Sequence, residues 1–461
     1  MRPIAHPATP GWQAEAIETL RLSGPLALAN LLQMLTYAVD VMFIARLGPA
    51  ELAASSLCIS VFGLLVWALQ SGVGAVAPII SAELGSRAPA LRPIRRATRM
   101  ALWLSGMLGV VAMAICVFAE SFMLLTGQEP HIAALAGQYM TILLFAMVPM
   151  IAAGVLRNFV SALGRPLFAT AITALGIGIN ALANWVFIFG NWGAPAMGLQ
   201  GAAIATVITG LCILALYILA IARDPRLARY HIFGFFWRPD WQRMRDILRI
   251  GTPIGLTVAA EASAFGGAAF LMGRIGALEL AAHTLALQIA AMAFQIPQGV
   301  GQAATIRVGY FLGARNAEGV RRAGWCAIAM GTGFMILTAA LMAFAPLWPL
   351  AIYIDPADPA NAELLDLAVS FLLIAAIFQL FDGLQSVAAG ALRGLQDTRV
   401  PMWFALFSYW LPGFGLATWL GLGTSFAGIG VWIGLAMGLI CASFLLLWRW
   451  HGREKFLPVL G

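Results

Sequence analysis

A long stretch of the chain, residues 166–222, contains no charged residue and reads PLFATAITALGIGINALANWVFIFGNWGAPAMGLQGAAIATVITGLCILALYILAIA. A membrane-spanning helix needs about 20 mostly apolar residues, so this stretch is too long for a single crossing. The cluster Asn191-Trp192-Gly193-Ala194-Pro195 is rich in turn-forming residues and divides the stretch into two helices. A second charge-free stretch, 400–448, is divided in the same way by Gly423-Thr424-Ser425. Each stretch therefore predicts a pair of spanning helices.

The composition of the whole chain agrees with this interpretation. Of its 461 residues 61% are hydrophobic and only 10% are charged, with a mean hydropathy of +0.88. A soluble domain carries about 25% charged residues, so this chain has too little polar surface to cover a water-soluble globule. Soluble, disordered, fibrous and disulfide-stapled classes are excluded. We predict an all-α polytopic membrane protein.

The apolar runs predict twelve transmembrane helices. They fall near residues 22–45, 52–82, 98–118, 132–156, 166–190, 197–222, 250–273, 280–306, 323–350, 365–392, 400–421 and 428–448.

Basic residues gather on one side of this arrangement. All but one of the 27 basic residues are Arg, and they concentrate in every second loop, at residues 87–99, 223–245, 307–322 and 393–399. The loops between these hold only Arg46 and Arg274. Because cytoplasmic loops collect basic residues, both termini are expected in the cytoplasm. The preference for Arg over Lys indicates a GC-rich bacterial genome, so we expect a multi-pass protein of a bacterial inner membrane. The net charge of +7 is then a topology signal, and no nucleic-acid partner is expected.

The chain contains an internal repeat at an offset of 228 positions. Leu20-Arg21-Leu22-Ser23-Gly24-Pro25 matches Leu248-Arg249-Ile250-Gly251-Thr252-Pro253, and Glu51-Leu52-Ala53-Ala54 matches Glu279-Leu280-Ala281-Ala282. Each copy holds six helices, so both insert with the same orientation. Parallel repeats of this kind are typical of transporters that rock two halves about an axis along the membrane normal.

The repeat predicts two six-helix bundles related by a pseudo-twofold axis along that normal. We expect an N-terminal bundle at residues 1–222, a cytoplasmic linker at 223–245 and a C-terminal bundle at 246–461. The tract Trp237–Arg249 fits an amphipathic surface helix or a plain basic linker equally well.

Three acids lie well inside predicted helices: Asp40, Glu261 and Asp382. An acid at the centre of a bilayer costs about 2.5–3.5 kcal/mol, so each of them needs a reason. One reason is a structural partner, or a place at the outer rim in the case of Asp40. The other is a function in binding protons, metal ions or cationic substrates.

Neutral polar residues lie inside two helices of the first repeat, and a proline lies in the first helix of each repeat. Asn180 and Asn184 are four positions apart and so share one helix face, and the next helix carries Thr206. Their oxygens suit a cation such as Na⁺ if a carboxylate completes the shell, and they equally suit ordinary interhelical hydrogen bonds. Pro25 and Pro253 occupy matching positions, where each is either a static kink or a hinge.

Motifs of enzymes are absent from the sequence. There is no GxxxxGK[ST] phosphate loop, no GxSxG elbow, no HExxH, and no metal-ligand spacing among the five Cys and five His. We expect no enzyme activity, no cofactor and no metal beyond a possible Na⁺ at Asp40.

Several local motifs resemble a known transporter family. They are Tyr37-Ala38-Val39-Asp40, Gly201-Ala202-Ala203-Ile204-Ala205-Thr206 and Ala391-Leu392-Arg393-Gly394-Leu395-Gln396-Asp397-Thr398. With the repeat and the helix count, they make the chain resemble the multidrug and toxic compound extrusion (MATE) family over essentially its whole length. Glu261 and Asp382 are similar to acids of the NorM-like bacterial branch. One departure is Phe378, which stands where some NorM-like relatives have Tyr, and it removes a candidate hydroxyl ligand.

The resemblance implies a secondary active antiporter that exports organic cations in exchange for H⁺ or Na⁺ by alternating access, and we expect a monomer in the lipid bilayer. It implies that Asp40, Asn180, Asn184 and Thr206 bind the coupling ion. It also implies that Glu261 and Asp382 serve substrate or a second ion, and that Pro25 bends its helix. Two other functions stay open: a flippase for lipid-linked precursors, which usually has a more basic cavity, and an intramembrane enzyme with an acid dyad.

Overall fold

The computed structural model describes residues 10–86, 90–125 and 127–456, with the side chains of Lys455 and Phe456 left out. Arg87, one of the loop charges considered above, lies outside the described residues, as do both chain ends. Within the described part every regular element is a helix, and twelve helical segments are long and apolar enough to cross a membrane. The predicted all-α fold and number of spans are confirmed.

The helices follow the predicted order, and several spans contain more than one element. The first six spans are α1 (Trp12–Ile44), α2 (Pro49–Val73) with α3 (Val76–Ser86), α4 (Leu91–Cys116), α6 (Pro130–Leu143) with α7 (Met147–Ala162), α8 (Pro166–Phe189) and α9 (Leu199–Arg223). The last six are α11 (Trp241–Ile275), α12 (Ala277–Gly313), α13 (Ala317–Phe344), α15 (Ala362–Gly394), α16 (Arg399–Ser408) with η4 (Tyr409–Gly415) and α17 (Leu416–Gly423), and α18 (Ala427–His451). Short connecting elements are α5 (Ala119–Leu125), η1 (Leu144–Ala146), η2 (Asn191–Gly193), α10 (Pro225–Ala228), α14 (Leu347–Leu350), η3 (Pro359–Asn361) and α19 (Arg453–Phe456).

Contacts divide the chain into two compact units. Unit 1 comprises Met1–Leu28 and Leu256–Gly461, and unit 2 comprises Ala29–Gly255. The boundaries expected at residues 222 and 246 divide the chain between its sixth and seventh spans. The compact units instead meet inside two helices, α1 and α11, and each meeting point lies within three residues of a proline, Pro25 or Pro253. The two changeover points are matched by the sequence repeat to within one residue. Each long helix thus begins in one unit and continues in the other.

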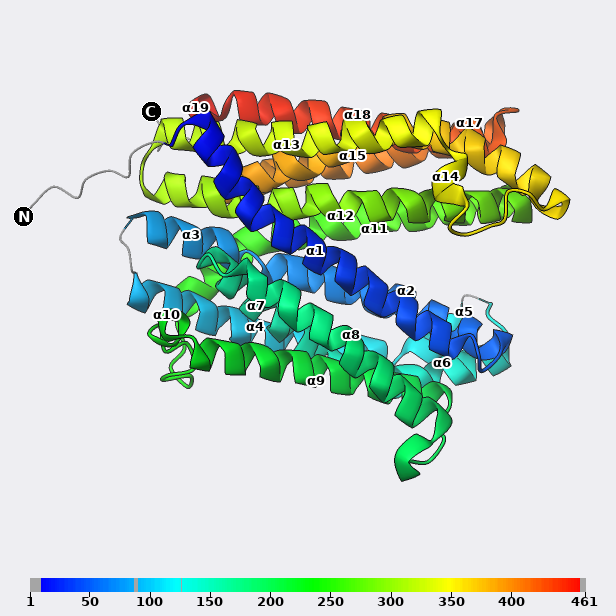
Figure 1. Cartoon of the computed structure of the whole chain (residues 1–461), viewed down its shortest axis with the longest axis horizontal. Coiled ribbons are helices and arrows are strands. Elements are labelled where there is room, and N and C mark those ends of the chain that lie inside the picture. Colours follow the sequence, from blue (N-terminus) through cyan, green and yellow to red (C-terminus); the bar gives the residue numbers. More distant parts are fainter. Residues whose placement is uncertain (1–9, 87–89, 126, 457–461) are drawn as a thin grey trace, which may run out of the picture. The chain divides into compact units, whose positions relative to one another are not determined.

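Unit 1 is built on four long helices that run side by side, α12, α13, α15 and α18 (Figure 1). Its buried apolar residues form two clusters, one around Phe371, Phe378 and Trp432 and the other around Phe311 and Trp450. The start of α1 belongs here because the buried carboxylate of Glu15 forms an ion pair with Arg307 on α12. Hydropathy locates only the apolar part of a helix, which was expected to begin at residue 22. The helix begins ten residues earlier, at Trp12, because the ion pair between Glu15 and Arg307 stabilises its polar first turns.

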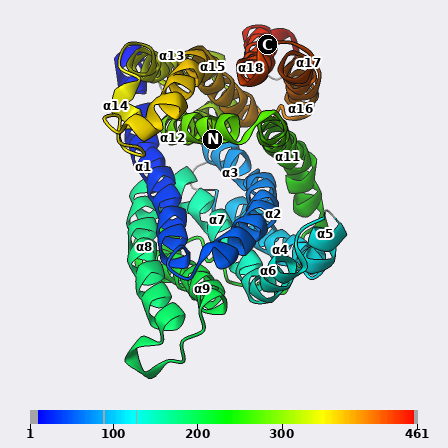
Figure 2. The same cartoon turned by 90° about the vertical axis from the view of Figure 1, so that its right-hand side faces the viewer.

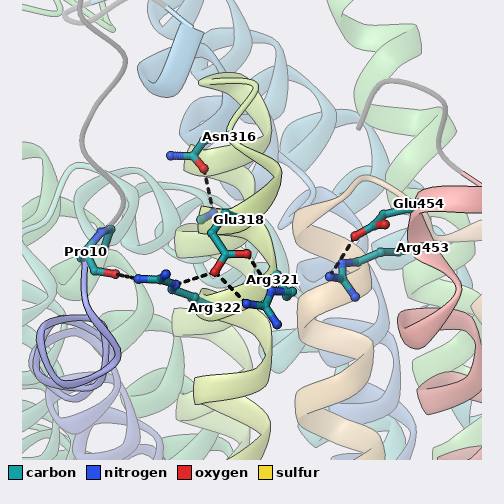
Figure 3. Close-up of polar contacts among 8 residues, drawn as sticks. Pro10, Asn316, Glu318, Arg321, Arg322, Arg453 and Glu454 are labelled. Carbon is teal, nitrogen blue, oxygen red and sulfur yellow. Dashed lines mark hydrogen bonds and ion pairs between the residues drawn. The ribbon is translucent and has the colours of Figure 1, made fainter. Parts of the chain in front are cut away.

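Polar contacts at the start of α13 tie the chain before α1 to the same unit (Figure 3). The Glu318 carboxylate accepts two hydrogen bonds of 2.7 Å from Arg321 and one of 2.6 Å from Arg322. Arg322 also donates to the backbone carbonyl of Pro10 at 2.8 Å. Asn316 caps the helix by accepting from the backbone N–H of Gly319.

Unit 2 packs around α7, with α8 and α9 side by side as a hairpin (Figure 2). Its single apolar cluster extends from Ile44 to Ile254 and includes Tyr139, Phe159 and Tyr217. Gly201 allows α8 and α9 to approach closely, because a Cβ there would lie 2.3 Å from the Phe187 carbonyl oxygen. This close packing against α9 holds α8, the helix that carries Asn180 and Asn184, in place within unit 2.

The segment 223–245 folds onto unit 2. Arg99 donates to the Phe235 carbonyl at 2.8 Å and the Trp103 indole donates to the Phe236 carbonyl at 3.0 Å. Asp240 forms an ion pair with Arg96, and Arg243 forms one with Glu83. The tract at Trp237–Arg249 is no separate surface helix, since residues from Trp241 onward are the first turns of α11.

Gly430, Gly434 and Gly438 are spaced four apart on α18 and form a ladder of small residues that packs directly against backbone. A Cβ on Gly434 would lie 2.2 Å from the backbone nitrogen of Ala417, and one on Gly438 would lie 2.8 Å from the Cα of Gly413.

We expect Gly434→Ala to lower the free energy of unfolding by about 1–3 kcal/mol, because the rigid helices must move apart. Thermal unfolding in detergent measures this. Gly106→Ala is the control, since a Cβ on Gly106 would have no neighbouring atom of another helix within 4 Å. Equal unfolding midpoints for the two variants would contradict the packing role of Gly434.

Asp240 gives a pH-dependent test of the docked segment. Burial raises the pKa of its carboxyl, but the hydrogen bond from the Arg243 backbone and the Arg96 ion pair outweigh burial and hold the pKa below its usual value. The stabilisation is therefore complete at neutral pH and is lost as the pH falls below about 4. We expect Asp240→Asn to cost about 1 kcal/mol at pH 7, since the Arg96 side chain is 52% exposed and solvent screens the pair. Unfolding measured across pH should show the variant and the parent converging in acid; a constant difference would refute the assignment.

Candidate functional site

Unit 2 holds a buried carboxylate fixed by two amides, which we call the Asp40 site (Asp40, Asn180 and Asn184). The Nδ2 atoms of Asn180 and Asn184 donate to the same oxygen, Asp40 Oδ1, at 2.9 and 2.7 Å. Asn184 Nδ2 also donates to Asn180 Oδ1 at 3.2 Å. The helical spacing of four predicted that the two amides share a face, and the structure places that face against α1.

The Asp40 site keeps a buried oxygen atom that no donor satisfies. All three side chains are buried, and in the described part of the chain no Arg forms an ion pair with Asp40. Asn184 Oδ1 is buried and has no hydrogen-bond partner. An unpaired oxygen beside a carboxylate is what a proton, a metal ion or an organic ammonium group requires. Chemically, the site can hold one cation.

Thr206, the fourth residue expected at this site, uses its hydroxyl elsewhere. It donates to the Ala202 carbonyl at 3.1 Å, within its own helix α9, and makes no hydrogen bond to Asp40. Its role as an ion ligand stays a prediction. Two tyrosines interact electrostatically with Asp40: Tyr37, which belongs to the Tyr37-Ala38-Val39-Asp40 motif, and Tyr139, which the sequence did not single out.

Unit 1 holds a second polar cluster, the paired-acid site (Glu261, Asp382, Gln385 and Tyr409). The Gln385 Nε2 atom lies 3.3 Å from both Glu261 Oε1 and Asp382 Oδ1, so one amide serves two carboxylates. The Tyr409 hydroxyl donates to Gln385 Oε1 at 2.9 Å and thereby fixes the orientation of the amide. The two acids come from different helices and are 121 positions apart in the sequence. The structure brings them together, as expected when both were assigned to substrate or a second ion.

Tyr409 was missed at the sequence level. It begins η4, a π-helical segment that contains Pro412, and such segments are frequent at functional sites. A proline in the middle of an apolar span was the signal that could have indicated it. Phe378, by contrast, is buried among Phe265 and Trp432 with ring centroids 5.9 and 5.4 Å away, so it belongs to the aromatic core. The hydroxyl that Phe378 lacks is supplied to this cluster by Tyr409.

Prolines 25 and 253 both lie inside continuous helices, α1 and α11. Each stands near the point where its helix passes from one compact unit to the other. The hinge role of these residues stays a prediction.

A family model, MatE, matches the chain twice, over residues 25–186 and 253–419. Both matches begin at the repeated proline, so they reproduce the offset of 228 found within the sequence. The chain belongs to the MATE family. This MATE protein is 44% identical over 453 residues to "Probable multidrug resistance protein NorM" of Mesorhizobium japonicum, covering 98% of this chain and 96% of the relative.

Other relatives agree along the whole length of the MATE chain. A protein of the same description from Brucella suis is 42% identical over 95% of this chain and 93% of its own. Among solved structures, the eukaryotic MATE transporter AtDTX14 superposes with a TM-score of 0.85 at 20% identity, covering 98% of this chain and 100% of that one. The MATE fold is therefore present from the first span to the last.

The shared amide of the paired-acid site yields a stability prediction. The carboxylates of Asp382, which is buried, and Glu261, which is partly buried, share one donor and form no ion pair among the described residues, so they repel each other when both are ionised. We expect Asp382→Asn to raise the free energy of unfolding at pH 8 by about 1–2 kcal/mol, because the amide removes a buried charge that has no cationic partner. Unfolding in detergent at pH 8 measures this. Asp397→Asn is the control and should destabilise, since Asp397 accepts from Arg449 at 2.8 Å; a destabilised Asp382→Asn variant would disprove the repulsion.

Proposed function

We propose that this MATE protein is a secondary active multidrug efflux transporter, which exports organic cations in exchange for H⁺ or Na⁺ by alternating access. The observation that carries the proposal is the Asp40 carboxylate, which is held inside a span by two amides and forms no ion pair with any residue that the structure describes. The names of its relatives, multidrug resistance proteins, support export of drugs. Chemistry on a bound cofactor has no part in this function.

Competition for one carboxylate is sufficient to couple two fluxes. In a medium of low dielectric constant an unpaired carboxylate is strongly disfavoured, so Asp40 should carry a proton, a metal ion or a cationic substrate at all times. If the site opens to each side of the membrane in turn, an entering ion displaces the departing cation. The membrane potential opposes export of a monovalent cation by about 2.3 kcal/mol per 100 mV, so the ion gradient has to supply this work.

The paired-acid site favours positively charged substrates for the same reason. An organic cation near Glu261 and Asp382 relieves the repulsion between them, and so does a second coupling ion. Pro25 and Pro253 would serve as the bending points, because a proline removes one backbone hydrogen bond from its helix. We place the protein as a monomer in the bacterial inner membrane with cytoplasmic termini.

Transport into sealed liposomes tests the proposal. Purified protein is reconstituted with a fluorescent organic cation, and a pH gradient and a Na⁺ gradient are imposed separately. We expect Asp40→Asn to reduce gradient-driven transport at least tenfold, because the neutral amide cannot exchange a charge. Asp366→Asn, an exposed acid on α15, is the control and should transport like the parent.

The two gradients also identify the coupling ion. Transport driven by the pH gradient alone would make Asp40 a proton carrier, whereas a requirement for Na⁺ would make Asn180 and Asn184 ligands of the ion. Normal transport by Asp40→Asn would overturn the assignment of the site. Silence of the parent under both gradients would favour the flippase function instead.

A further inference from the structure

Arginines gather in unit 2 where the start of α4 meets the docked segment 223–245. We call Arg92, Arg95, Arg99 and Arg238 the arginine cluster; the first three lie on α4 and the fourth on the docked segment. Among the residues that the structure describes, none of the four forms an ion pair. A group of positive charges without acids to neutralise it attracts an anion.

Phe235, on the docked segment, holds three of these arginines together. The guanidinium carbon of Arg95 lies 5.8 Å from the centre of the Phe235 ring, and that of Arg238 lies 5.1 Å from it. Arg99 Nη1 donates to the Phe235 carbonyl oxygen at 2.8 Å. Topology requires basic residues on one side of the membrane, but it does not require three of them to converge on one residue.

The acid nearest to the arginine cluster is already paired. Among the described residues, Asp240 is the one acid that interacts electrostatically with Arg99. Its carboxylate forms an ion pair with Arg96 and also accepts from the backbone N–H of Arg243 at 3.2 Å. The charges of the cluster therefore repel one another with no acid of their own.

Arg99 also has an unused hydrogen-bond donor. Its side chain is only 6% exposed, and its Nε atom is buried with no hydrogen-bond partner. A buried charged donor without an acceptor is costly. The Nε atom belongs to the same guanidinium that bonds to Phe235, so it lies within the cluster. An oxyanion bound there would supply the missing acceptor.

The matching helix of unit 1 neutralises its own arginines (Figure 3). Arg95-Arg96 on α4 corresponds to Arg321-Arg322 on α13, and at the same offset of 226 Arg92 corresponds to Glu318. The Glu318 carboxylate accepts hydrogen bonds from both arginines of α13. Unit 2 thus carries a positive charge where unit 1 carries the neutralising acid. Because the repeated fold accommodates an acid at this position, Arg92 indicates a ligand that is specific to unit 2.

Exposed aromatic rings beside the arginine cluster place that ligand in the bilayer. Phe235 and Trp237 are 48% and 72% exposed, and Phe236 and Trp241 are exposed as well. Aromatic rings at the end of a span lie at the level of the lipid headgroups. These rings stand at such an end, because Trp241 begins α11 and the Trp103 indole of α4 donates to the Phe236 carbonyl.

We propose that the arginine cluster binds the phosphate headgroup of an anionic phospholipid, while the exposed rings of Phe235 and Trp237 pack against the glycerol and the upper acyl chains. The planar guanidinium group matches the geometry of phosphate oxygens. A lipid with a net negative charge is favoured over a zwitterionic one, because the cluster offers no free acid to a choline group. The inference does not depend on the transport function.

Native mass spectrometry of the full-length protein in detergent tests the site. Phosphatidylglycerol and phosphatidylcholine with identical acyl chains are titrated, and the affinity for the first bound lipid is measured. We expect the parent to bind phosphatidylglycerol at least tenfold more tightly than phosphatidylcholine. The double variant Arg95→Gln/Arg238→Gln should lose tenfold or more in affinity for phosphatidylglycerol, because two phosphate contacts are removed. Its affinity for phosphatidylcholine should change less than about twofold.

A second variant copies the arrangement of unit 1 into unit 2. Arg92→Glu places an acid three and four residues before Arg95 and Arg96, as Glu318 stands before its two arginines. We expect the affinity for phosphatidylglycerol to fall tenfold or more while the thermal unfolding midpoint stays at or above that of the parent. This result separates loss of the site from loss of the fold.

The matched control removes two arginines that have acid partners. Arg21→Gln/Arg321→Gln has the same net charge as the first variant, and its arginines are paired with Glu18 and Glu318. It should change the affinity for phosphatidylglycerol less than about twofold. If it weakens binding as much as Arg95→Gln/Arg238→Gln does, binding follows net charge and the assignment of the cluster is wrong.

Two further results would overturn the proposal. One is equal weakening of both lipids by Arg95→Gln/Arg238→Gln, since the cluster would then not recognise the negative charge. The other is displacement of phosphatidylglycerol by an equal concentration of glycerol 1-phosphate, its soluble headgroup. The ligand would then be a free phosphate compound, and the aromatic rings would have no part in binding it.

Discussion

A polar group inside a bilayer must find its partners within the protein, because no water is available to it. The rest of this structure depends on that constraint. Charged groups that hold the fold together pair with opposite charges. The buried Glu15 carboxylate, for example, pairs with Arg307 and holds the start of α1 on α12. At Asp40 and Arg157 the partners are neutral amides, which satisfy hydrogen bonds but leave the charge uncompensated.

The two repeats share a fold and differ in electrostatics. The offset of 228 aligns Pro25 with Pro253 and relates the changeover points between the compact units. At the same offset Asp40 corresponds to Ala268 and Gln33 to Glu261, so the acids stand at different depths in the two copies. Duplication supplied matched helices, and divergence placed a carboxylate next to amides in one unit and a pair of carboxylates in the other. In the proposed function, this asymmetry allows the ion and the substrate to be held by different groups.

Much of the Asp40 site could be predicted from sequence because helical periodicity is local. A spacing of four puts Asn180 and Asn184 on one face whatever surrounds them. The hydroxyl of Thr206 illustrates the limit: nothing in the sequence shows whether it points to Asp40 or, as found, to the Ala202 carbonyl. Tyr409 and Gln385 could not be joined from the sequence either, since their contact depends on the π-helical turn that rotates Tyr409 toward α15.

The sequence by itself determined that this chain is a twelve-span membrane protein of duplicated origin with three acids inside its helices. Those properties follow from composition and from short-range periodicity, which need no knowledge of packing. Only the tertiary structure decided which polar groups meet: that one amide serves both Glu261 and Asp382, that residues 223–245 dock on unit 2, and that Arg157 faces amides instead of an acid. The physical reason is that such contacts depend on how helices distant in the sequence rotate and approach one another, and those rotations are fixed by the close packing of many apolar side chains together.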